Sequence, residues 1–238
     1  MLRFFFLNAF IAIFTIVWIF YGLLVSVFDK SGSVMHFKCA VPWAKVILWV
    51  CGVKVKVHGL IQGEMNRPCI YMSNHQSMFD IFTLLGCLPA DFKFILKQEL
   101  MKIPLFGFAL KRARYISIDR ENPRLAVKSM NEAAERIKNG TSVLIFPEGT
   151  RSIDGRLLAF KPGGFHLALK SGCDIVPVTI INSRHIAPKG SLRIKKGHVI
   201  MNIGKPIPVK DCTKKDMVQL MDRVKETMTA QMKESELQ

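Results

Sequence analysis

The sequence lacks several features that mark whole classes of proteins. It has no Cys-x-x-Cys pair, no low-complexity tract and few acidic residues, with 18 Asp and Glu against 34 Lys and Arg. Hydrophobic residues make up 50% of its 238 positions. A chain this apolar can bury enough surface to offset the entropy of ordering, which excludes a disordered or collagen-like protein. The length suits one α/β domain with an appendage.

The cysteines and histidines form no pattern typical of a disulfide framework or a metal site. Several of the six cysteines fall inside apolar runs, where a free thiol behaves as a small hydrophobe. The six histidines show no His-x-x-x-His or mixed Cys/His spacing. We therefore expect reduced core cysteines and no bound metal. Reduced thiols favour a catalytic body that faces the cytosol.

Positive charge dominates the chain. The formal net charge is +16, and most of the excess lies in residues 51–204. A charge of this size indicates an anionic partner such as nucleic acid, a lipid headgroup or a phosphorylated substrate. Nucleic acid is disfavoured, because the basic residues are interleaved with predicted core strands and the aromatic residues cluster near the N-terminus. We expect no nucleic acid partner, and an anionic lipid surface or a phosphorylated ligand instead.

The amino-terminal region is the most apolar part of the sequence. Residues 4–28 contain no charged side chain, and as one helix they would extend about 37 Å, more than the roughly 30 Å hydrocarbon thickness of a bilayer. A cleaved signal peptide fits poorly, since its apolar region is shorter and ends in small residues. Residues 34–51 are apolar but interrupted by a proline and two lysines. They predict an interfacial helix, half of a re-entrant hairpin, or an amphipathic helix buried on the body.

From residue 52 onward, short β-rich runs alternate with longer helical runs, which is typical of an α/β domain. The pattern predicts a mixed, largely parallel sheet flanked by helices, with a membrane-associated helical pair at the N-terminus. The expected division is a membrane-anchoring segment over residues 1–51 and an α/β domain over residues 52–238. Predicted strands are Lys54–Val57, Cys69–Ser73, Phe92–Leu96, Tyr115–Ile118, Ser142–Phe146, Ile175–Ile181, Leu192–Ile194 and Val199–Ile203. Predicted helices cover residues 123–139, 165–170 and 214–233.

A histidine and an aspartate follow one of the predicted strands. His75 and Asp80 are five residues apart, so on one helix they would lie about 140° apart around the axis and could not meet. They can meet if His75 lies in a loop and Asp80 in the first turn of the next helix. The carboxylate would then hold the imidazole tautomer and stabilise the imidazolium formed when His75 removes a proton. A substrate hydroxyl can serve as the nucleophile, so no serine or cysteine is required. Taken alone, the spacing also fits an ordinary polar loop.

A second polar segment follows the predicted strand that ends at Phe146. Gly149 permits close approach of the backbone to a ligand, Arg151 offers a planar fork of donors suited to phosphate, and Thr150 adds a hydroxyl. The segment predicts an anion site, although an ordinary turn has a similar composition.

Loops that follow parallel strands gather at one edge of a sheet. His75, Arg120 and Arg151 should therefore converge in one cleft. Lys97 would add a positive group at the same edge, although a solvated surface lysine is the alternative for that residue.

Taken in order, these motifs resemble the glycerolipid acyltransferases, a family typified by 1-acyl-sn-glycerol-3-phosphate (lysophosphatidic acid) acyltransferase. Residues 74–80 are similar to the family's Asn-His-x-Ser-x-x-Asp, residues 118–120 to its second block, residues 146–152 to Phe-Pro-Glu-Gly-Thr-Arg-Ser, and residues 176–178 to its fourth block. The likeness covers about residues 52–205. One departure precedes the second block, where the sequence reads Lys-Arg-Ala-Arg-Tyr and relatives often have a glycine.

The resemblance implies transfer of a fatty acyl group from acyl-CoA or acyl carrier protein to the sn-2 hydroxyl of 1-acyl-sn-glycerol 3-phosphate, giving phosphatidic acid in phospholipid biosynthesis. It implies His75 as general base, oriented by Asp80. The substrate-binding residues that it implies are Arg120, Glu148, Gly149, Thr150, Arg151 and Lys97. No cofactor is expected, because the thioester is itself a substrate. The expected partners are the lysophospholipid and thioester substrates, acyl carrier protein as one possible donor, and the bilayer, at the cytoplasmic face of the inner (plasma) membrane.

Two other functions remain open at this point. An enzyme of the same fold could use another acceptor, such as glycerol 3-phosphate, another lysophospholipid or an aminolipid. A non-catalytic lipid-binding membrane protein could keep the anion site as a scaffold. The presence of both His75 and Asp80 argues against a scaffold, since a binding protein needs no base.

Overall fold

The computed structural model describes residues 1–59, 67–119 and 123–236 of the chain. The strands are β1 (Val53–Gly59), β2 (Ile70–Ser73), β3 (Phe92–Lys97), β4 (Ile116–Ile118), β5 (Ser142–Ile145), β6 (Ile175–Ile181) and β7 (Gly197–Ile203). The α-helices are α1 (Leu2–Ser26), α2 (Ser33–Met35), α3 (Val41–Cys51), α4 (Phe79–Cys87), α5 (Phe106–Arg112), α6 (Pro123–Lys138), α7 (Gly163–Ser171), α8 (Ser183–Ile186) and α9 (Met217–Glu236). A π-helical turn, η1 (His36–Ala40), and two 3₁₀ turns, η2 (Gln98–Lys102) and η3 (Lys214–Asp216), complete the described elements.

The strands form one mixed sheet in the order β1-β7-β6-β2-β5-β3-β4. Strand β2 pairs in parallel with β5 and β6, and β3 pairs in parallel with β5 and β4. Strands β6 and β7 are antiparallel, and β1 is parallel to β7. Strands β1 and β7 therefore run in the direction opposite to the other five strands. The predicted mixed, largely parallel sheet is confirmed. Because β2, β5 and β3 are neighbours and point the same way, the loops that follow them meet at one edge of the sheet.

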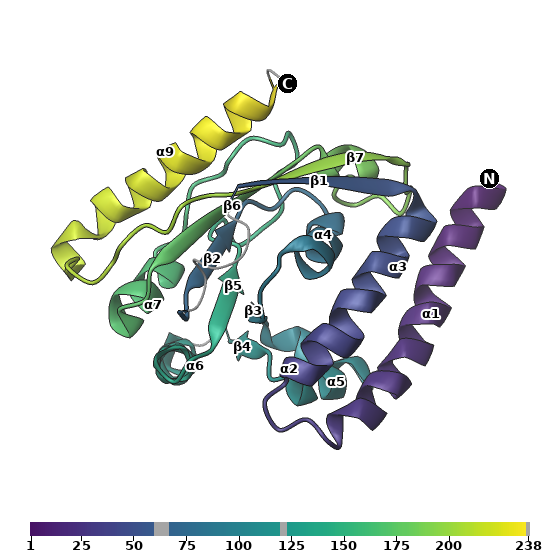
Figure 1. Cartoon of the computed structure of the whole chain (residues 1–238), viewed down its shortest axis with the longest axis horizontal. Coiled ribbons are helices and arrows are strands. Elements are labelled where there is room, and N and C mark those ends of the chain that lie inside the picture. The colour runs from purple at the N-terminus through teal and green to yellow at the C-terminus, as the bar shows by residue number, and fades with distance from the viewer. Residues whose placement is uncertain (60–66, 120–122, 237–238) are drawn as a thin grey trace.

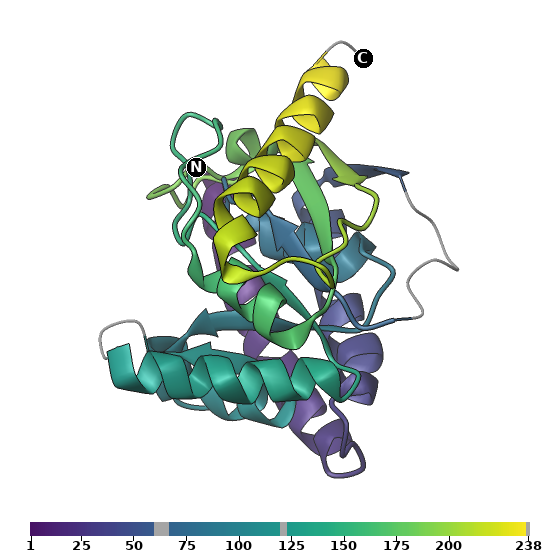
Figure 2. The same ribbon diagram turned by 90° about the vertical axis from the view of Figure 1, so that its left-hand side faces the viewer.

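The sheet is the middle of three layers (Figure 1). On one face, buried residues of α1, α3 and α4 share a hydrophobic cluster with strand residues such as Tyr71 and Leu144. On the other face, α6, α7 and α9 pack on alternate strand residues such as Met72 and Val143, and Figure 2 shows these three helices in front of the sheet. Adjacent strand residues therefore face opposite cores, which explains why the central strands are apolar throughout.

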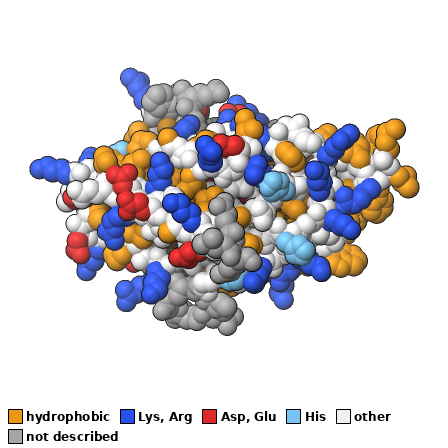
Figure 3. Space-filling model, turned by 90° about the horizontal axis from the view of Figure 1, so that it is seen from above, with side chains coloured by type: hydrophobic (Ala, Val, Ile, Leu, Met, Phe, Trp, Pro, Cys, Tyr) orange, Lys and Arg blue, Asp and Glu red, His pale blue; other side chains and the backbone are white. Residues whose placement is uncertain are grey.

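The amino-terminal helices form an antiparallel pair on the outside of the body (Figure 1). Among the described residues, two segments are long and apolar enough to cross a membrane by length and composition: Leu2–Ser26 and Ser33–Cys51. The first is mostly exposed, whereas more of the second is buried against the body. Seen from above, hydrophobic side chains gather at the right-hand end of the molecule, the side on which α1 lies (Figure 3).

Side-chain hydrogen bonds hold the two helices of this pair together. The Trp18 indole N–H donates to the Cys39 carbonyl (2.8 Å), and the Trp43 indole N–H donates to the Thr15 hydroxyl (3.2 Å). Pro42 has no N–H to donate, so the helix cannot keep a regular α pattern there and widens into the π turn before it.

One predicted strand is wrong. Residues 192–194 form a loop, and their carbonyl groups accept hydrogen bonds from α1 instead of from a neighbouring strand. Asn8 donates to the Leu192 carbonyl (3.1 Å), and Arg3 donates to the Ile194 carbonyl. The loop therefore fastens the start of α1 to the body, a role that the short apolar run did not indicate.

The other predicted elements lie close to their observed places. The helix expected at residues 165–170 begins two residues earlier, at Gly163, and the last helix begins as the 3₁₀ turn η3 before α9. Helices α5 and α8 are not predicted. The sequence also predicts Asn122 as the capping residue of the helix that begins at Pro123, and Asn122 lies outside the described residues.

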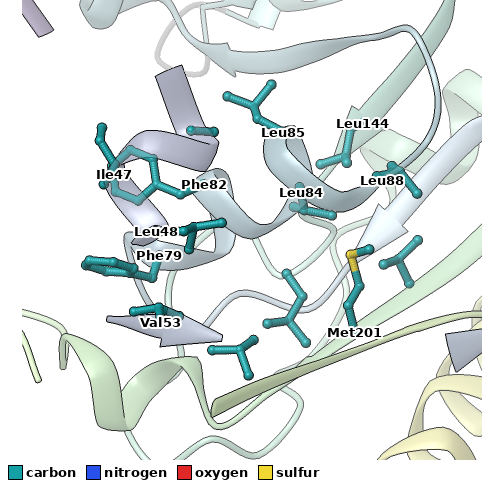
Figure 4. Packing of buried hydrophobic residues seen from close by; sticks show 14 of the residues in the cluster. Ile47, Leu48, Val53, Phe79, Phe82, Leu84, Leu85, Leu88, Leu144 and Met201 are labelled. Carbon is teal, nitrogen blue, oxygen red and sulfur yellow. The ribbon is translucent and has the colours of Figure 1, made fainter. Parts of the chain in front are cut away.

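Helix α3 packs one face on α4 and leaves the other open. Ile47 is completely buried and lies beside Phe82 of α4 (Figure 4). Trp49, two residues later on α3, is 80% exposed.

We expect Ile47→Ala to destabilise the detergent-solubilised protein by about 2–5 kcal/mol, because it leaves a cavity in the packed core. Its midpoint of thermal unfolding, followed by circular dichroism, should fall by roughly 5 °C or more. Trp49→Ala is the matched control on the same helix and should change stability by less than about 0.5 kcal/mol. Equal losses for the two variants would mean that α3 does not pack as described.

Candidate active site

The His75–Asp80 pair lies at the turn from β2 into α4. Asp80 is in the first turn of α4 and is completely buried. Its Oδ2 atom lies 2.7 Å from Nδ1 of His75 and also accepts hydrogen bonds from the backbone N–H groups of Gln76 (2.6 Å) and Ser77 (2.8 Å). With the proton on Nδ1, the imidazole donates to the carboxylate, and Nε2 is left to accept a proton. The predicted loop-to-helix geometry is confirmed.

The loop that carries His75 is fixed from several sides. The Asn74 amide bonds the Ile180 backbone of β6 twice, donating to its carbonyl (2.8 Å) and accepting from its N–H (2.7 Å). The Ser77 hydroxyl donates to the Ala187 carbonyl (2.7 Å). The ring of Phe146, which directly follows β5, stacks on the His75 imidazole with centroids 4.0 Å apart and planes 14° apart. The imidazole therefore has little freedom to rotate away from Asp80.

Glu148 joins the loop after β2 to the loop after β5. Its two carboxylate oxygens accept from the backbone N–H groups of His75 (2.7 Å) and Leu158 (2.9 Å). The His75 carbonyl in turn accepts from the N–H of Ser152 (2.7 Å). Burial raises the pKa of Glu148 to about 7, although the two backbone hydrogen bonds act in the opposite direction. In this geometry Glu148 positions the two loops, and contact with a substrate stays a prediction.

The segment that follows Glu148 reaches the surface of the site. Gly149 has φ +70, and a Cβ atom there would lie 3.0 Å from the Lys161 side chain, so a larger residue would be both strained and crowded. The Lys189 ammonium donates to the Thr150 hydroxyl (3.1 Å) and to the Arg151 carbonyl (3.0 Å). Two further basic side chains, Lys161 and Lys189, thus accompany Arg151.

A cavity of about 500 Å³ is lined by His75, by residues of β3 and by residues of helices α1, α3 and α5. Its walls are mostly apolar and include Trp18, Met35, Trp43 and Phe94. Polar and basic groups line part of the same cavity: His75, Lys97, Thr150, Arg151 and Lys189. The site can therefore hold a hydrocarbon chain next to a base and an anion-binding region.

The structure brings most of the predicted site residues together. His75, Lys97, Gly149, Thr150 and Arg151 line the cavity, while Asp80 and Glu148 support His75 from behind. Arg120 lies outside the described residues.

Sequence reasoning missed two site residues, Phe146 and Lys189. Phe146 lies in the segment 146–152, which resembles a family motif but does not indicate stacking on His75. Lys189 lies 39 residues after Thr150 in the sequence, and no local pattern predicts a contact between them. The described residues contain no group of three or more His, Cys, Asp or Glu side chains that could hold a metal ion.

Comparisons with known proteins agree with this geometry. A family model described as Acyltransferase matches residues 54–181. The chain is 40% identical over 185 residues to the chloroplastic 1-acyl-sn-glycerol-3-phosphate acyltransferase BAT2 of Brassica napus, covering 77% of this chain and 53% of that protein. It is 33% identical over 183 residues to the human 1-acyl-sn-glycerol-3-phosphate acyltransferase alpha, covering 76% and 65%. The chain spans about half the length of the plant relatives that it matches.

A solved structure extends the likeness to the whole chain. The crystal structure of the 1-acyl-sn-glycerophosphate (LPA) acyltransferase PlsC from Thermotoga maritima matches with a TM-score of 0.83 and 30% sequence identity, covering 100% of this chain and 98% of that one. The fold and the site define an α/β protein with a histidine–aspartate pair beside an apolar cavity. The chain belongs to the acyltransferase family, which confirms the resemblance drawn from its motifs.

We expect Glu148→Gln to change how stability depends on pH. The pKa of Glu148 is raised from an ordinary value of 4.5 to about 7, so its stabilising contribution is complete below about pH 4.5 and is lost as the pH rises through about 7. The variant has no such group. The Tm of the wild type minus that of Glu148→Gln should therefore decrease between about pH 4.5 and pH 7.5.

Exposed Glu226 on α9 offers the control for this measurement. Glu226→Gln should leave the difference in Tm nearly constant with pH. A constant difference for Glu148→Gln as well would show that the Glu148 carboxyl is not perturbed by its surroundings.

Proposed function

We propose that the protein is a 1-acyl-sn-glycerol-3-phosphate acyltransferase. In this proposal it transfers a fatty acyl group from a thioester to the sn-2 hydroxyl of 1-acyl-sn-glycerol 3-phosphate and gives phosphatidic acid for phospholipid biosynthesis. The observation that carries the proposal is the hydrogen-bonded pair of partly exposed His75 and buried Asp80, beside an apolar cavity that basic side chains also line. The printed activities of the Brassica, human and Thermotoga relatives support the same acceptor.

In the proposed reaction, Nε2 of His75 removes the proton from the acceptor hydroxyl as its oxygen attacks the thioester carbonyl carbon. Asp80 stabilises the imidazolium that forms, because its buried carboxylate lies 2.7 Å from Nδ1. The carbon–sulfur bond then breaks, and the imidazolium returns its proton to the departing thiolate. The products are the ester and a free thiol, and His75 is neutral again. The reaction as proposed uses no cofactor beyond its two substrates.

Different parts of the site suit different parts of the substrates in charge and shape. Arg151 and Lys97 line the cavity with His75 and are suited to hold the acceptor phosphate through charge-assisted hydrogen bonds. Gly149 and Thr150 line the same cavity, and Arg120 completes the set by resemblance to the family. The apolar walls would accept a fatty acyl chain.

The amino-terminal pair would bring this site to its lipid substrates. Side chains of α1 such as Phe5, Ile13 and Phe20 are more than half exposed, and exposed apolar surface of this extent favours contact with a bilayer. We place the protein at the cytoplasmic face of the inner membrane, where acyl-CoA or acyl carrier protein can deliver the thioester.

We expect His75→Ala to lower kcat/KM by about 10²–10⁴-fold, the usual contribution of a general base. Thiol release by purified, detergent-solubilised protein would be measured with acyl-CoA or acyl carrier protein as donor and a panel of lysolipids and glycerol 3-phosphate as acceptors. His198→Ala, at an exposed position of β7, is the control and should keep wild-type turnover. Retention of more than about a tenth of kcat/KM by folded His75→Ala would remove the base assignment.

We expect Arg151→Ala to discriminate between acceptors. Loss of a charge-assisted hydrogen bond should lower kcat/KM by roughly 10–100-fold for lysophosphatidic acid, and much less for monoacylglycerol, which has no phosphate. Arg223→Ala, at an exposed position of α9, should affect neither acceptor. An equal loss with both acceptors would contradict a phosphate-binding role.

A further inference from the structure

We propose that the protein carries a second phosphate-binding site, outside the catalytic cavity, which holds the headgroup of an anionic phospholipid. The site is a basic pocket at the outer edge of β4. The inference rests on the membrane association within the proposed function, and it is independent of acyl transfer.

The pocket has a volume of about 320 Å³ and lies between η2, α5, β4 and α6. Four cationic side chains line it: Lys102, Lys111, Arg114 and Arg136. Ser117 adds a hydroxyl group, Tyr115 also lines the pocket, and no carboxylate is among the described residues that line it. Of its lining residues only Tyr115 also borders the catalytic cavity, and His75 and Arg151 do not reach it. The two sites are therefore separate.

Like charges crowd this pocket, and none of the described residues that line it is acidic. Arg136 is half-buried, and its pKa is lowered by burial and by the neighbouring Arg114 guanidinium. Arginine nonetheless stays protonated in proteins, so the repulsion persists in the empty pocket. A bound phosphate would relieve it and would accept hydrogen bonds from several of the donors at once.

The backbone on both sides of α5 is strained. Leu105, before the helix, has φ 59, and Arg114, after it, has φ 62. Among the described residues only one other non-glycine residue, Asn182, has a positive φ. A bulky side chain in this region costs conformational energy that glycine would avoid. Backbone strain of this kind persists where the surrounding structure holds the residue in place, and it is concentrated at functional positions. At position 114 the side chain of the strained residue lines the basic pocket.

An exposed apolar patch accompanies the pocket and indicates a lipid rather than a soluble phosphate. The patch consists of Ile103 (46% exposed), Leu105 (45%) and Phe108 (56%). Lys102 and Lys111 of the pocket lie within one helical turn of it along the chain. A phosphorylated metabolite needs no apolar surface beside its phosphate, whereas a phospholipid brings both a phosphate and hydrocarbon chains.

The patch continues the exposed surface of α1. Helix α5 packs against α1, and the Arg112 guanidinium donates to the hydroxyl (2.9 Å) and the carbonyl (2.7 Å) of Ser26 at the end of that helix. Figure 1 shows α5 close to the lower end of the amino-terminal pair. If α1 lies in the bilayer, the α5 segment meets the same membrane surface, with its basic pocket at headgroup level.

Binding of lipid by the full-length protein in neutral detergent tests the proposal. The probes are fluorescent short-chain phosphatidylglycerol and the matching phosphatidylcholine, added without any acyl donor. We expect the wild type to prefer phosphatidylglycerol, and Arg114→Gly to weaken that binding by about tenfold with little effect on phosphatidylcholine. Because glycine relieves the backbone strain, the Tm of Arg114→Gly should be equal to or higher than that of the wild type.

Further variants separate this pocket from the catalytic site and from bulk charge. Arg114→Gly should weaken phosphatidylglycerol binding by the same factor in the wild type and in an Arg151→Ala background, Arg223→Gln should leave the binding unchanged, and Arg114→Lys should retain much of it. Unchanged binding by Arg114→Gly, or a matching loss in Arg223→Gln, overturns the proposal. Displacement of the lipid by coenzyme A at similar concentration, sensitive to Arg114→Gly, would assign the pocket to a soluble phosphate compound and overturn the lipid assignment. Because no donor is present, these outcomes do not depend on whether the protein transfers acyl groups.

Discussion

A buried carboxylate sets the geometry on which the site depends. Asp80 is removed from water, so its charge must be met by hydrogen bonds from the protein. It receives them from the His75 imidazole and from the backbone N–H groups of Gln76 and Ser77. The same contacts that stabilise the carboxylate shape the loop between β2 and α4. Local folding and the orientation of the base are therefore one constraint, and neither can change without the other.

The order of the strands brings the remaining site residues to the same edge of the sheet as this loop. Strands β5 and β3 lie beside β2 in parallel, so the loop with Arg151 and the end of β3 with Lys97 arrive at the same edge as His75. Glu148 then ties the first two loops together through two backbone N–H groups. The amino-terminal helices line the apolar cavity together with the sheet, so the most apolar part of the chain also forms a wall of the candidate site.

Much of the site could be predicted because its residues are close in sequence or follow strands of a parallel sheet. His75 and Asp80 are separated by five residues at a strand-to-helix turn, and that geometry has few solutions. The incorrect strand prediction at 192–194 and the missed residue Lys189 have equally clear physical causes. The run 192–194 has strand-like composition, but Arg3 and Asn8 of a distant helix take its carbonyl groups. Lys189 reaches Thr150 from 39 residues away, and no local pattern signals such a contact.

The sequence by itself determined the alternation of strands and helices, the apolar amino-terminal pair and the pairing of His75 with Asp80, because periodicity and short-range spacing are local properties of a sequence. Only the tertiary structure decided that Phe146 stacks on His75, that Glu148 braces two loops, and that Arg114 joins Arg136 and two lysines in one pocket. These arrangements depend on which distant segments pack together. Which segments pack together depends on burying both faces of the sheet at the same time, and this is a property of the whole fold.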